Sequence, residues 1–175
     1  MFADDSVRSD LAKGMLYVSR GRHSDAERQL DLTADWVLRS GSHEHLCALL
    51  LYRAHLDMKK GDLAGALQSL DEGQAIAQES LFQIYRMEFQ VARSELAYRR
   101  GETDKARDFA REVAVDATGA SVKYFWGEVK ALRVLVESSK ESPVTEQTTK
   151  DIERLAELKR VATSNLTRSG AGVYA

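Results

Sequence analysis

Arg99-Arg100-Gly101-Glu102-Thr103-Asp104-Lys105-Ala106 is the clearest of three copies of one sequence pattern in this chain. The two earlier copies occupy residues 19–26 and 59–66. In every copy a basic residue precedes a glycine and an alanine follows five residues after it, so that the glycines lie forty residues apart at positions 21, 61 and 101. A pattern that recurs at one fixed period indicates stacked copies of one supersecondary unit. The sequence therefore predicts a repeat protein.

The segments on either side of each glycine have the pattern of amphipathic helices. Before Gly21, apolar residues recur at three- and four-residue steps, which predicts a helix over about residues 6–20. Glycine ends a helix readily because it adopts left-handed dihedrals at little cost. We expect Ser24 and Thr103 to cap the helices that follow, with Glu27 completing a capping box with Ser24. Each repeat is thus predicted to be a helical hairpin.

Four such hairpins account for the chain, and no alternating strand pattern occurs. The fourth copy has lost the motif: position 141 is not a glycine, Glu146 replaces the alanine, and the only proline, Pro143, falls in the break. A divergent last repeat with a polar outer face is typical of the end of a solenoid. We predict an all-α solenoid of about four antiparallel helical hairpins. The expected repeats are at about 6–41, 42–80, 81–119 and 120–165, followed by a flexible tail at 166–175.

Small residues recur where the two helices of a hairpin should meet. Gly14, Ala54 and Ser94 share one register of the first helices, and Ala26, Ala66 and Ala106 share one register of the second helices. Small side chains at facing positions let two helix axes approach to about 8–9 Å. Gly73 lies inside a predicted helix, where it costs up to about 1 kcal/mol relative to alanine. We interpret it as a residue required by close packing.

Composition excludes several classes of protein. The chain has 175 residues, 43% of them apolar and 30% charged, with a net charge of −2, so we expect neither disorder nor a nucleic-acid partner. Cys47 is the only cysteine, which rules out an intramolecular disulfide and favours a reducing compartment. The acidic N-terminus does not resemble a signal peptide, and no apolar run reaches the roughly 18–20 residues that cross a bilayer. A soluble cytoplasmic protein without membrane contact is expected.

The repeats resemble the tetratricopeptide repeat family. The resemblance covers about residues 6–118 in three copies and continues weakly to about 165, with two departures: the period is forty residues instead of the usual thirty-four or so, and the closing proline of each repeat is absent. These departures are similar to a long-helix variant of the family. The family implies a right-handed superhelix whose first helices line a concave groove for a peptide or protein segment, and it implies no catalysis. The residues that match the family pattern are Gly14, Tyr17, Gly21, Ala26, Leu30, Ala54, Gly61, Asp62, Ala66, Leu70, Ser94, Gly101, Ala106 and Ala110.

The family register also indicates which side chains would face such a groove. Met15, Met58 and Tyr98 fall at or near equivalent steps of successive repeats, and adaptable Met with amphipathic Tyr suits the docking of an apolar segment. Ordinary stacking contacts between hairpins explain the same residues equally well, because a fold does not by itself imply a binding site. The candidate partner-binding residues are Leu51, His55, Met58, Lys59, Val91, Glu95, Tyr98 and Arg99, with Leu11, Met15, Val18 and Glu88 at related positions.

No catalytic or cofactor-binding motif occurs in the sequence. His43, His45 and Cys47 form the only spacing that suggests a metal site, at a helix start. On a helix His45 points away from the face shared by His43 and Cys47, so a three-ligand site would need His43 to lie outside the helix. A solvated helix end with a buried thiol is the commoner arrangement. We therefore expect no metal and no cofactor.

Two functional hypotheses remain. The first is a non-enzymatic scaffold or adaptor that binds a peptide or partner protein through the concave face. The second is a sensory or regulatory repeat module of a larger signalling ATPase, cyclase or transcription regulator. In the second case the first helix should expose an apolar stacking face through Phe2, Val7 and Leu11, and the protein could form a homodimer by end-to-end stacking.

Overall fold

The computed structural model describes residues 2–118, 125–140 and 145–170, and within 2–5 and 164–170 only the backbone. These residues contain eight helices and no strand. We refer to the successive helix pairs as units 1 to 4. The helices are α1 (Phe2–Ser19), α2 (His23–Ser40), α3 (His43–Lys60), α4 (Leu63–Glu79), α5 (Gln83–Arg99), α6 (Thr103–Thr118), α7 (Phe125–Ser138) and α8 (Glu146–Gly170).

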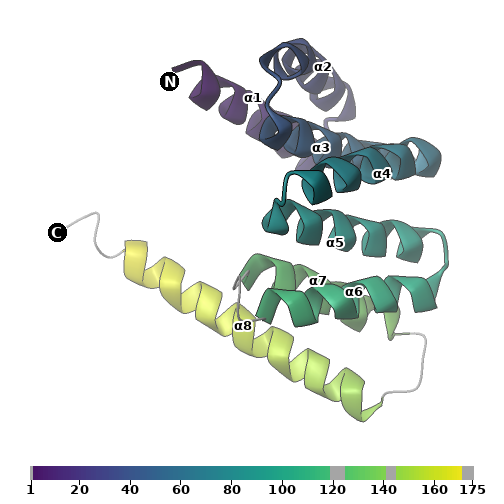
Figure 1. The fold of residues 1–175 in the computed structure, drawn as a ribbon. Coiled ribbons are helices and arrows are strands. Elements are labelled where there is room, and N and C mark those ends of the chain that lie inside the picture. The colour runs from purple at the N-terminus through teal and green to yellow at the C-terminus, as the bar shows by residue number, and fades with distance from the viewer. Residues whose placement is uncertain (1, 119–124, 141–144, 171–175) are drawn as a thin grey trace.

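The helix pairs stack in chain order, with α1 and α2 at the top of Figure 1 and α8 at the bottom. Each helix packs against the next one along the chain. In addition, α1, α3, α5 and α7 pack against one another in sequence, whereas α2, α4 and α6 make no mutual contacts in the described part of the chain. The prediction of an all-helical solenoid of antiparallel hairpins is confirmed. The helix α8 runs to Gly170, past residue 166 where we expected the tail to begin; 171–175 lie outside the described residues.

Three buried clusters join the units, and each cluster is shared by two neighbours. Units 1 and 2 share Val7, Leu30 and Leu49, among others. Units 2 and 3 share a second cluster, and units 3 and 4 a third. A hairpin that buries its apolar face only against its neighbours is the usual arrangement in repeat proteins, so stability comes from the interfaces as well as from the units.

The three repeated glycines form the turns inside units 1 to 3. Gly21, Gly61 and Gly101 have φ angles of 70°, 84° and 76°, the left-handed region that glycine adopts without steric cost. In each turn the amide of the next residue donates to the carbonyl five residues back, which closes the helix end in the same way. These bonds, each 2.9 Å, are Arg22 N to Tyr17 O, Asp62 N to Asp57 O and Glu102 N to Ala97 O.

Two turns join units 1 to 2 and units 2 to 3, and the second of them contains a residue with a strained backbone conformation. Gly41 turns the chain with a φ of 64°, and forty residues later Leu81 takes the same place with a φ of 57°. The amide of Phe82 donates to the carbonyl of Ala77 at 2.9 Å, so the helix end closes as it does at the glycines. Leu81 is 78% exposed and therefore gains little from packing.

Our prediction of the capping residues was wrong for Ser24 and Thr103. The helix α2 begins at His23 with Arg22 as its N-cap, and α6 begins at Thr103 itself. The cause is the short turn, because the residue directly after the glycine already closes the preceding helix and the next helix starts one residue later. Only in unit 2 is that residue a good cap: Asp62 accepts from the Gly65 amide at 2.9 Å.

The small residues lie at helix contacts. Gly14, Ala54 and Ser94 are all buried, as are Ala26, Ala66 and Ala106. The hydroxyl of Ser94 donates to the carbonyl of Ala106 at 2.6 Å, so the two sets of small residues are in contact in unit 3. At Gly14 an added Cβ would lie 2.6 Å from Cδ2 of Leu30, so alanine would not fit without a shift.

Gly73 has the packing role that we inferred. An added Cβ would collide with the ring of Phe89, a fully buried residue of α5. The glycine therefore lets the large ring of unit 3 sit directly against α4 of unit 2. The cost of a glycine in a helix interior is offset by the burial of this ring.

An ion pair recurs at the boundary between units and then stops. Arg53 pairs with Asp31 at 2.9 Å, and forty residues later Arg93 pairs with Asp71. Forty residues after Arg93 and Asp71 stand Arg133 and Arg111, and two like charges cannot form an ion pair. The boundary between units 3 and 4 thus lacks the contact that the two earlier boundaries share.

Candidate functional site

A hollow of the described structure lies where α1, α3, α5 and α7 are neighbours, and we call it the concave groove. Its volume is about 740 Å³. Unit 1 contributes Met15, Val18 and Ser19, and unit 2 contributes His55 and Lys59. Unit 3 contributes Glu88, Val91, Glu95, Tyr98 and Arg99. Unit 4 contributes Lys130, Arg133, Val134 and Glu137. All four lining helices are the first helices of their units, because these helices form the row that packs together.

The structure brings six of the eight candidate residues together in this groove, and the other two lie elsewhere. His55, Lys59, Val91, Glu95, Tyr98 and Arg99 all line it. Leu51 and Met58 are buried in the apolar cluster between units 2 and 3 and do not line the groove. Tyr98 is 38% exposed, so its ring remains accessible to a partner. Most of the residues expected in units 1 to 3 thus lie at the groove, whereas the sequence pattern indicated none of the lining residues of unit 4.

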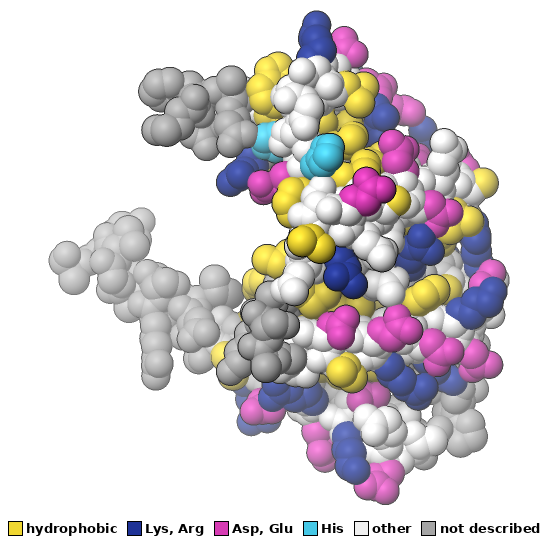
Figure 2. Space-filling model, viewed as in Figure 1, with side chains coloured by type: hydrophobic (Ala, Val, Ile, Leu, Met, Phe, Trp, Pro, Cys, Tyr) yellow, Lys and Arg dark blue, Asp and Glu magenta, His cyan; other side chains and the backbone are white. Residues whose placement is uncertain are grey.

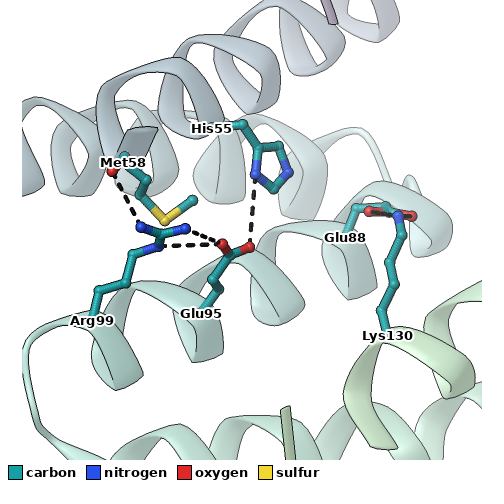
Figure 3. Close-up of polar contacts among 6 residues, drawn as sticks. All are labelled: His55, Met58, Glu88, Glu95, Arg99 and Lys130. Carbon is teal, nitrogen blue, oxygen red and sulfur yellow. Dashed lines mark hydrogen bonds and ion pairs between the residues drawn. The ribbon is translucent and has the colours of Figure 1, made fainter. Parts of the chain in front are cut away.

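Glu95 is the centre of a polar cluster on the groove floor, drawn in Figure 3. Its carboxylate accepts from Nη2 and Nε of Arg99 at 2.8 and 3.2 Å, and it lies 4.0 Å from Nδ1 of His55. Arg99 also donates from Nη1 to the carbonyl of Met58 at 3.5 Å. The cluster therefore ties α5 to α3 at the groove surface.

Burial and charge act in opposite directions on this cluster. Burial lowers the pKa of His55, although the nearby Glu95 carboxylate opposes the effect. Burial alone would raise the pKa of Glu95, but the hydrogen bond from Arg99 and the neighbouring positive charges outweigh it, so that this pKa is lowered. At neutral pH the cluster is thus a charged Arg99–Glu95 pair beside a neutral imidazole.

A second ion pair joins α5 to α7 in the groove. Nζ of Lys130 lies 2.5 and 2.6 Å from the two carboxylate oxygens of Glu88, a residue that is itself buried (Figure 3). Glu137 pairs with Lys140 at 2.5 Å. All three carboxylates that line the groove are therefore neutralised by a base. Lys59 and Arg133, in contrast, form no hydrogen bond or ion pair with the described residues.

The helix α7 presents a different face to the groove from α3 and α5. By the forty-residue register, Leu135 is equivalent to His55 and Glu95, yet Leu135 is buried. Val134 holds the register of the fully buried Ala54 and Ser94, but it is only partly buried and lines the groove. The helix is thus turned about its axis relative to its equivalents, and this turn carries Arg133 into the groove.

The helix α7 also packs against α8. Arg154 of α8 donates to the buried carboxylate of Glu128 on α7 at 2.7 and 3.3 Å. Leu155 and Leu158 of α8 share a buried cluster with Leu132 and Leu135. The only sequence signal of the turned α7 was Val134 at a position that is Gly, Ala or Ser in the first three units.

His43, His45 and Cys47 contact three different neighbours. His43 and Ser80 share a hydrogen bond of 2.9 Å, and the His45 ring lies edge-on to that of Trp36. Cys47 is fully buried, and burial raises its pKa to about 11, so its thiol stays protonated at neutral pH. All three residues lie in α3, where His45 faces away from the other two. Among the described residues no group of three or more His, Cys, Asp or Glu is arranged to hold a metal ion.

The outer surface shows mixed charge and no exposed stacking face at α1. On the side drawn in Figure 2, acidic and basic side chains are interspersed, without a broad area of one sign. Val7 and Leu11 are buried within the protein's own core, so they do not form the stacking face that we expected for a sensory module. The side chain of Phe2 lies outside the described residues.

The chain matches no protein-family model, no curated protein and no solved structure. The resemblance to tetratricopeptide repeats therefore stays a prediction, carried by the residues at the turns and the helix contacts. None of the helices in the described part combines the length and the apolar character that crossing a bilayer requires.

Proposed function

We propose that this protein is a non-enzymatic scaffold of the tetratricopeptide-like type that binds a peptide or a segment of a partner protein in the concave groove. The observation that supports this proposal is the groove itself: a hollow of about 740 Å³ lined by one helix from each unit. Solenoids of helical hairpins use such concave surfaces to bind other proteins. A cytoplasmic location belongs to the same proposal, because the one cysteine, Cys47, is free and buried.

The lining side chains suit a protein segment. Tyr98, which is exposed, and the partly exposed Met15 and Val134 offer amphipathic and apolar contacts, and the ion pairs around them fix the floor of the groove. Aromatic and apolar anchors surrounded by polar groups are typical of sites that bind peptides and proteins.

Site-specific photocrosslinking in the cells that make the protein tests this function. A benzophenone amino acid replaces Tyr98 in one variant and Leu32 in a matched control; Leu32 lies on α2 outside the groove and is 72% exposed. We expect the Tyr98 variant to form a discrete adduct with another protein that the Leu32 variant does not form. The absence of any adduct at Tyr98, or the same adducts at both positions, would overturn the proposal. Circular dichroism verifies that both variants fold.

A further inference from the structure

We propose that the segment bound in the concave groove has an apolar centre with an acidic side chain on each side, held by Lys59 and Arg133. This inference rests on the proposed function and names the chemistry of the partner. Its basis is the pairing of charges in the groove. Four basic and three acidic side chains line it, which gives a formal charge of +1, whereas the chain as a whole carries −2.

Two of the four lining cations have no acidic partner in the described part of the chain, because Glu137 pairs with Lys140, which lies outside the lining. Glu88 is paired with Lys130, Glu95 with Arg99, and Glu137 with Lys140, so the acids of the groove are already neutralised. Lys59 and Arg133 form no ion pair with the described residues, and both are exposed. A partner carboxylate that approaches either cation therefore gains an ion pair without breaking an internal one.

The loss of the repeated boundary contact explains why Arg133 is available. Its equivalents Arg53 and Arg93 are held by Asp31 and Asp71 at the unit boundaries. At the third boundary Arg111 replaces the aspartate and α7 is turned, so Arg133 lines the groove instead. One departure from the repeat, Arg111, removes the internal partner, and a second, the turn of α7, moves the cation to the groove surface.

The helices that carry the two cations are separated by the width of two helix contacts. Lys59 lies on α3 and Arg133 on α7, and each of these helices packs against α5 between them. Neighbouring helix axes lie about 8–10 Å apart, so the axes of the two helices that carry the cations are separated by roughly 16–20 Å. An extended segment covers this distance in about five or six residues at 3.3 Å per residue. A helix covers it in about eleven to thirteen residues at 1.5 Å per residue.

The centre of the segment is expected to be apolar. Beside the two cations the groove presents the exposed Tyr98 on α5 and the partly exposed Val134 on α7. A nucleic acid fits this pattern poorly, since its phosphates are uniformly spaced and the carboxylates of Glu88 and Glu95 lie on the floor of the groove. An acidic–apolar–acidic protein segment satisfies both the free cations and the apolar surface beside them.

Peptide display on the intact protein tests the inference. A random sixteen-residue library is selected on the wild-type protein, on Lys59→Glu/Arg133→Glu and on the control Lys13→Glu/Arg86→Glu, which reverses two exposed bases outside the groove. We expect the wild type and the control to enrich peptides with two acids about five or six residues apart (eleven to thirteen if helical) around apolar residues. The groove variant should lose this bias. A fluorescent copy of the best peptide should bind the groove variant roughly tenfold or more weakly, because like charges repel.

A bulky maleimide on Tyr98→Cys separates failure of the inference from failure of the proposed function; labelling is selective because Cys47 is fully buried. Peptides that the label blocks but that lack acids, or that bind the groove variant equally well, would overturn the inference alone. If the label blocks none of the enriched peptides, both the function and the inference are overturned. A single-stranded oligonucleotide that binds tighter than any peptide, and is released by the charge reversal, would also overturn the inference.

Discussion

Leu81 is the only non-glycine residue with a positive φ in the described part of the chain. A left-handed conformation costs an L-residue about 1–2 kcal/mol, and Leu81 recovers little of this because its side chain is mostly exposed. Glycine at position 81 removes this cost. It also gives the unfolded chain more conformational entropy, which stabilises the unfolded state by roughly 0.5–1 kcal/mol.

We expect Leu81→Gly to raise the free energy of unfolding by about 0.5–1 kcal/mol, measured by urea denaturation. Leu81→Ala is the matched control, since alanine removes the same exposed side chain but keeps the unfavourable φ. Equal stability of the two variants would contradict the strain at this turn.

Gly73 reverses the usual effect of a Gly-to-Ala change in a helix. In an ordinary helix interior the change gains up to about 1 kcal/mol. Here the added methyl group would overlap the buried Phe89 ring, so we expect Gly73→Ala to lower the free energy of unfolding by roughly 1–3 kcal/mol. Glu72→Ala, next to it and exposed, should change little.

A double-mutant cycle assigns the Gly73 cost to its contact. Combined with Phe89→Leu, which removes ring atoms from the overlap, Gly73→Ala should cost clearly less than it does alone. If the two changes simply add, the contact between Gly73 and Phe89 is not the cause.

His55 makes stability depend on pH in a defined direction. Burial lowers its pKa in the folded state, and the groups that face it are Glu95, Glu88, Lys59 and Lys130. As pH falls through the ordinary histidine pKa of about 6.5, His55 therefore binds a proton in the unfolded chain but not in the folded protein. Folding stability decreases as pH is lowered through this range and levels off below the folded pKa.

Thermal unfolding of the wild type and of His55→Gln checks this effect. The melting temperature of the wild type should fall between pH 7.5 and 5.5, and that of His55→Gln should fall less. Glu95 does not interfere in this interval, because its lowered pKa places its titration at more acidic pH. Parallel curves for the two proteins would exclude His55 as the source.

At the scale of elements, the repeated motif predicted the helix ends better than the helix starts. The turns at Gly21, Gly61 and Gly101 followed from one property, tolerance of positive φ, that depends only on the residue itself. The starts depended on how many residues separate the glycine from the next helix. This number is set by the backbone hydrogen bond that closes the turn, so Ser24 and Thr103 fell inside their helices.

The position of α7 could not be predicted from the repeats. In units 1 to 3 the register follows from small residues that fit only at a helix contact. In unit 4 the equivalent position is Val134, and α7 also pairs with α8 through Arg154 and the buried carboxylate of Glu128, a long-range contact that no local pattern predicts. The candidate site was therefore predictable as far as α5, and Lys130, Arg133, Val134 and Glu137 required the structure.

The pair between Arg154 and Glu128 provides a test of how α8 is attached. Arg154→Met removes the partner of a buried carboxylate, and we expect α8 to lose roughly 1–2 kcal/mol of local stability. This range allows for solvent screening, because the Arg154 side chain is 43% exposed.

Hydrogen exchange measures the change helix by helix. The amides of α8 should exchange faster in Arg154→Met, while those of α3 keep their wild-type rates. Lys150→Met disrupts an exposed pair with Glu146 on the same helix and should leave α8 nearly unchanged. Equal effects of the two variants would mean that the buried carboxylate is not what holds α8.

At the scale of the molecule, stability is distributed along one dimension. In the described part of the chain, α1 and α2 make no contact with α7 or α8, and every contact joins helices at most two apart in sequence. Energetic effects of a substitution should therefore fall with distance along the array.

A cavity in the first unit tests this expectation. Leu30 is buried between α1 and α2, and Leu30→Ala should cost roughly 2–5 kcal/mol. We expect hydrogen exchange to quicken in α1 and α2 and to stay unchanged in α7 and α8. Leu155→Ala, in the cluster of units 3 and 4, should give the opposite distribution. Uniform loss of protection in both variants would show that the array unfolds as one body.

Because each unit, as far as the described residues extend, contacts only the neighbouring units, this arrangement also determines how the protein responds to mechanical force. Tension applied at its two ends passes through the unit boundaries one after another, so the weakest boundary separates while the others keep their structure. A unit of about forty residues, once unfolded, adds on the order of 130–140 Å to the length of the chain. Under load the protein would thus lengthen in discrete steps, and the part of the groove formed by the units still folded would keep its shape.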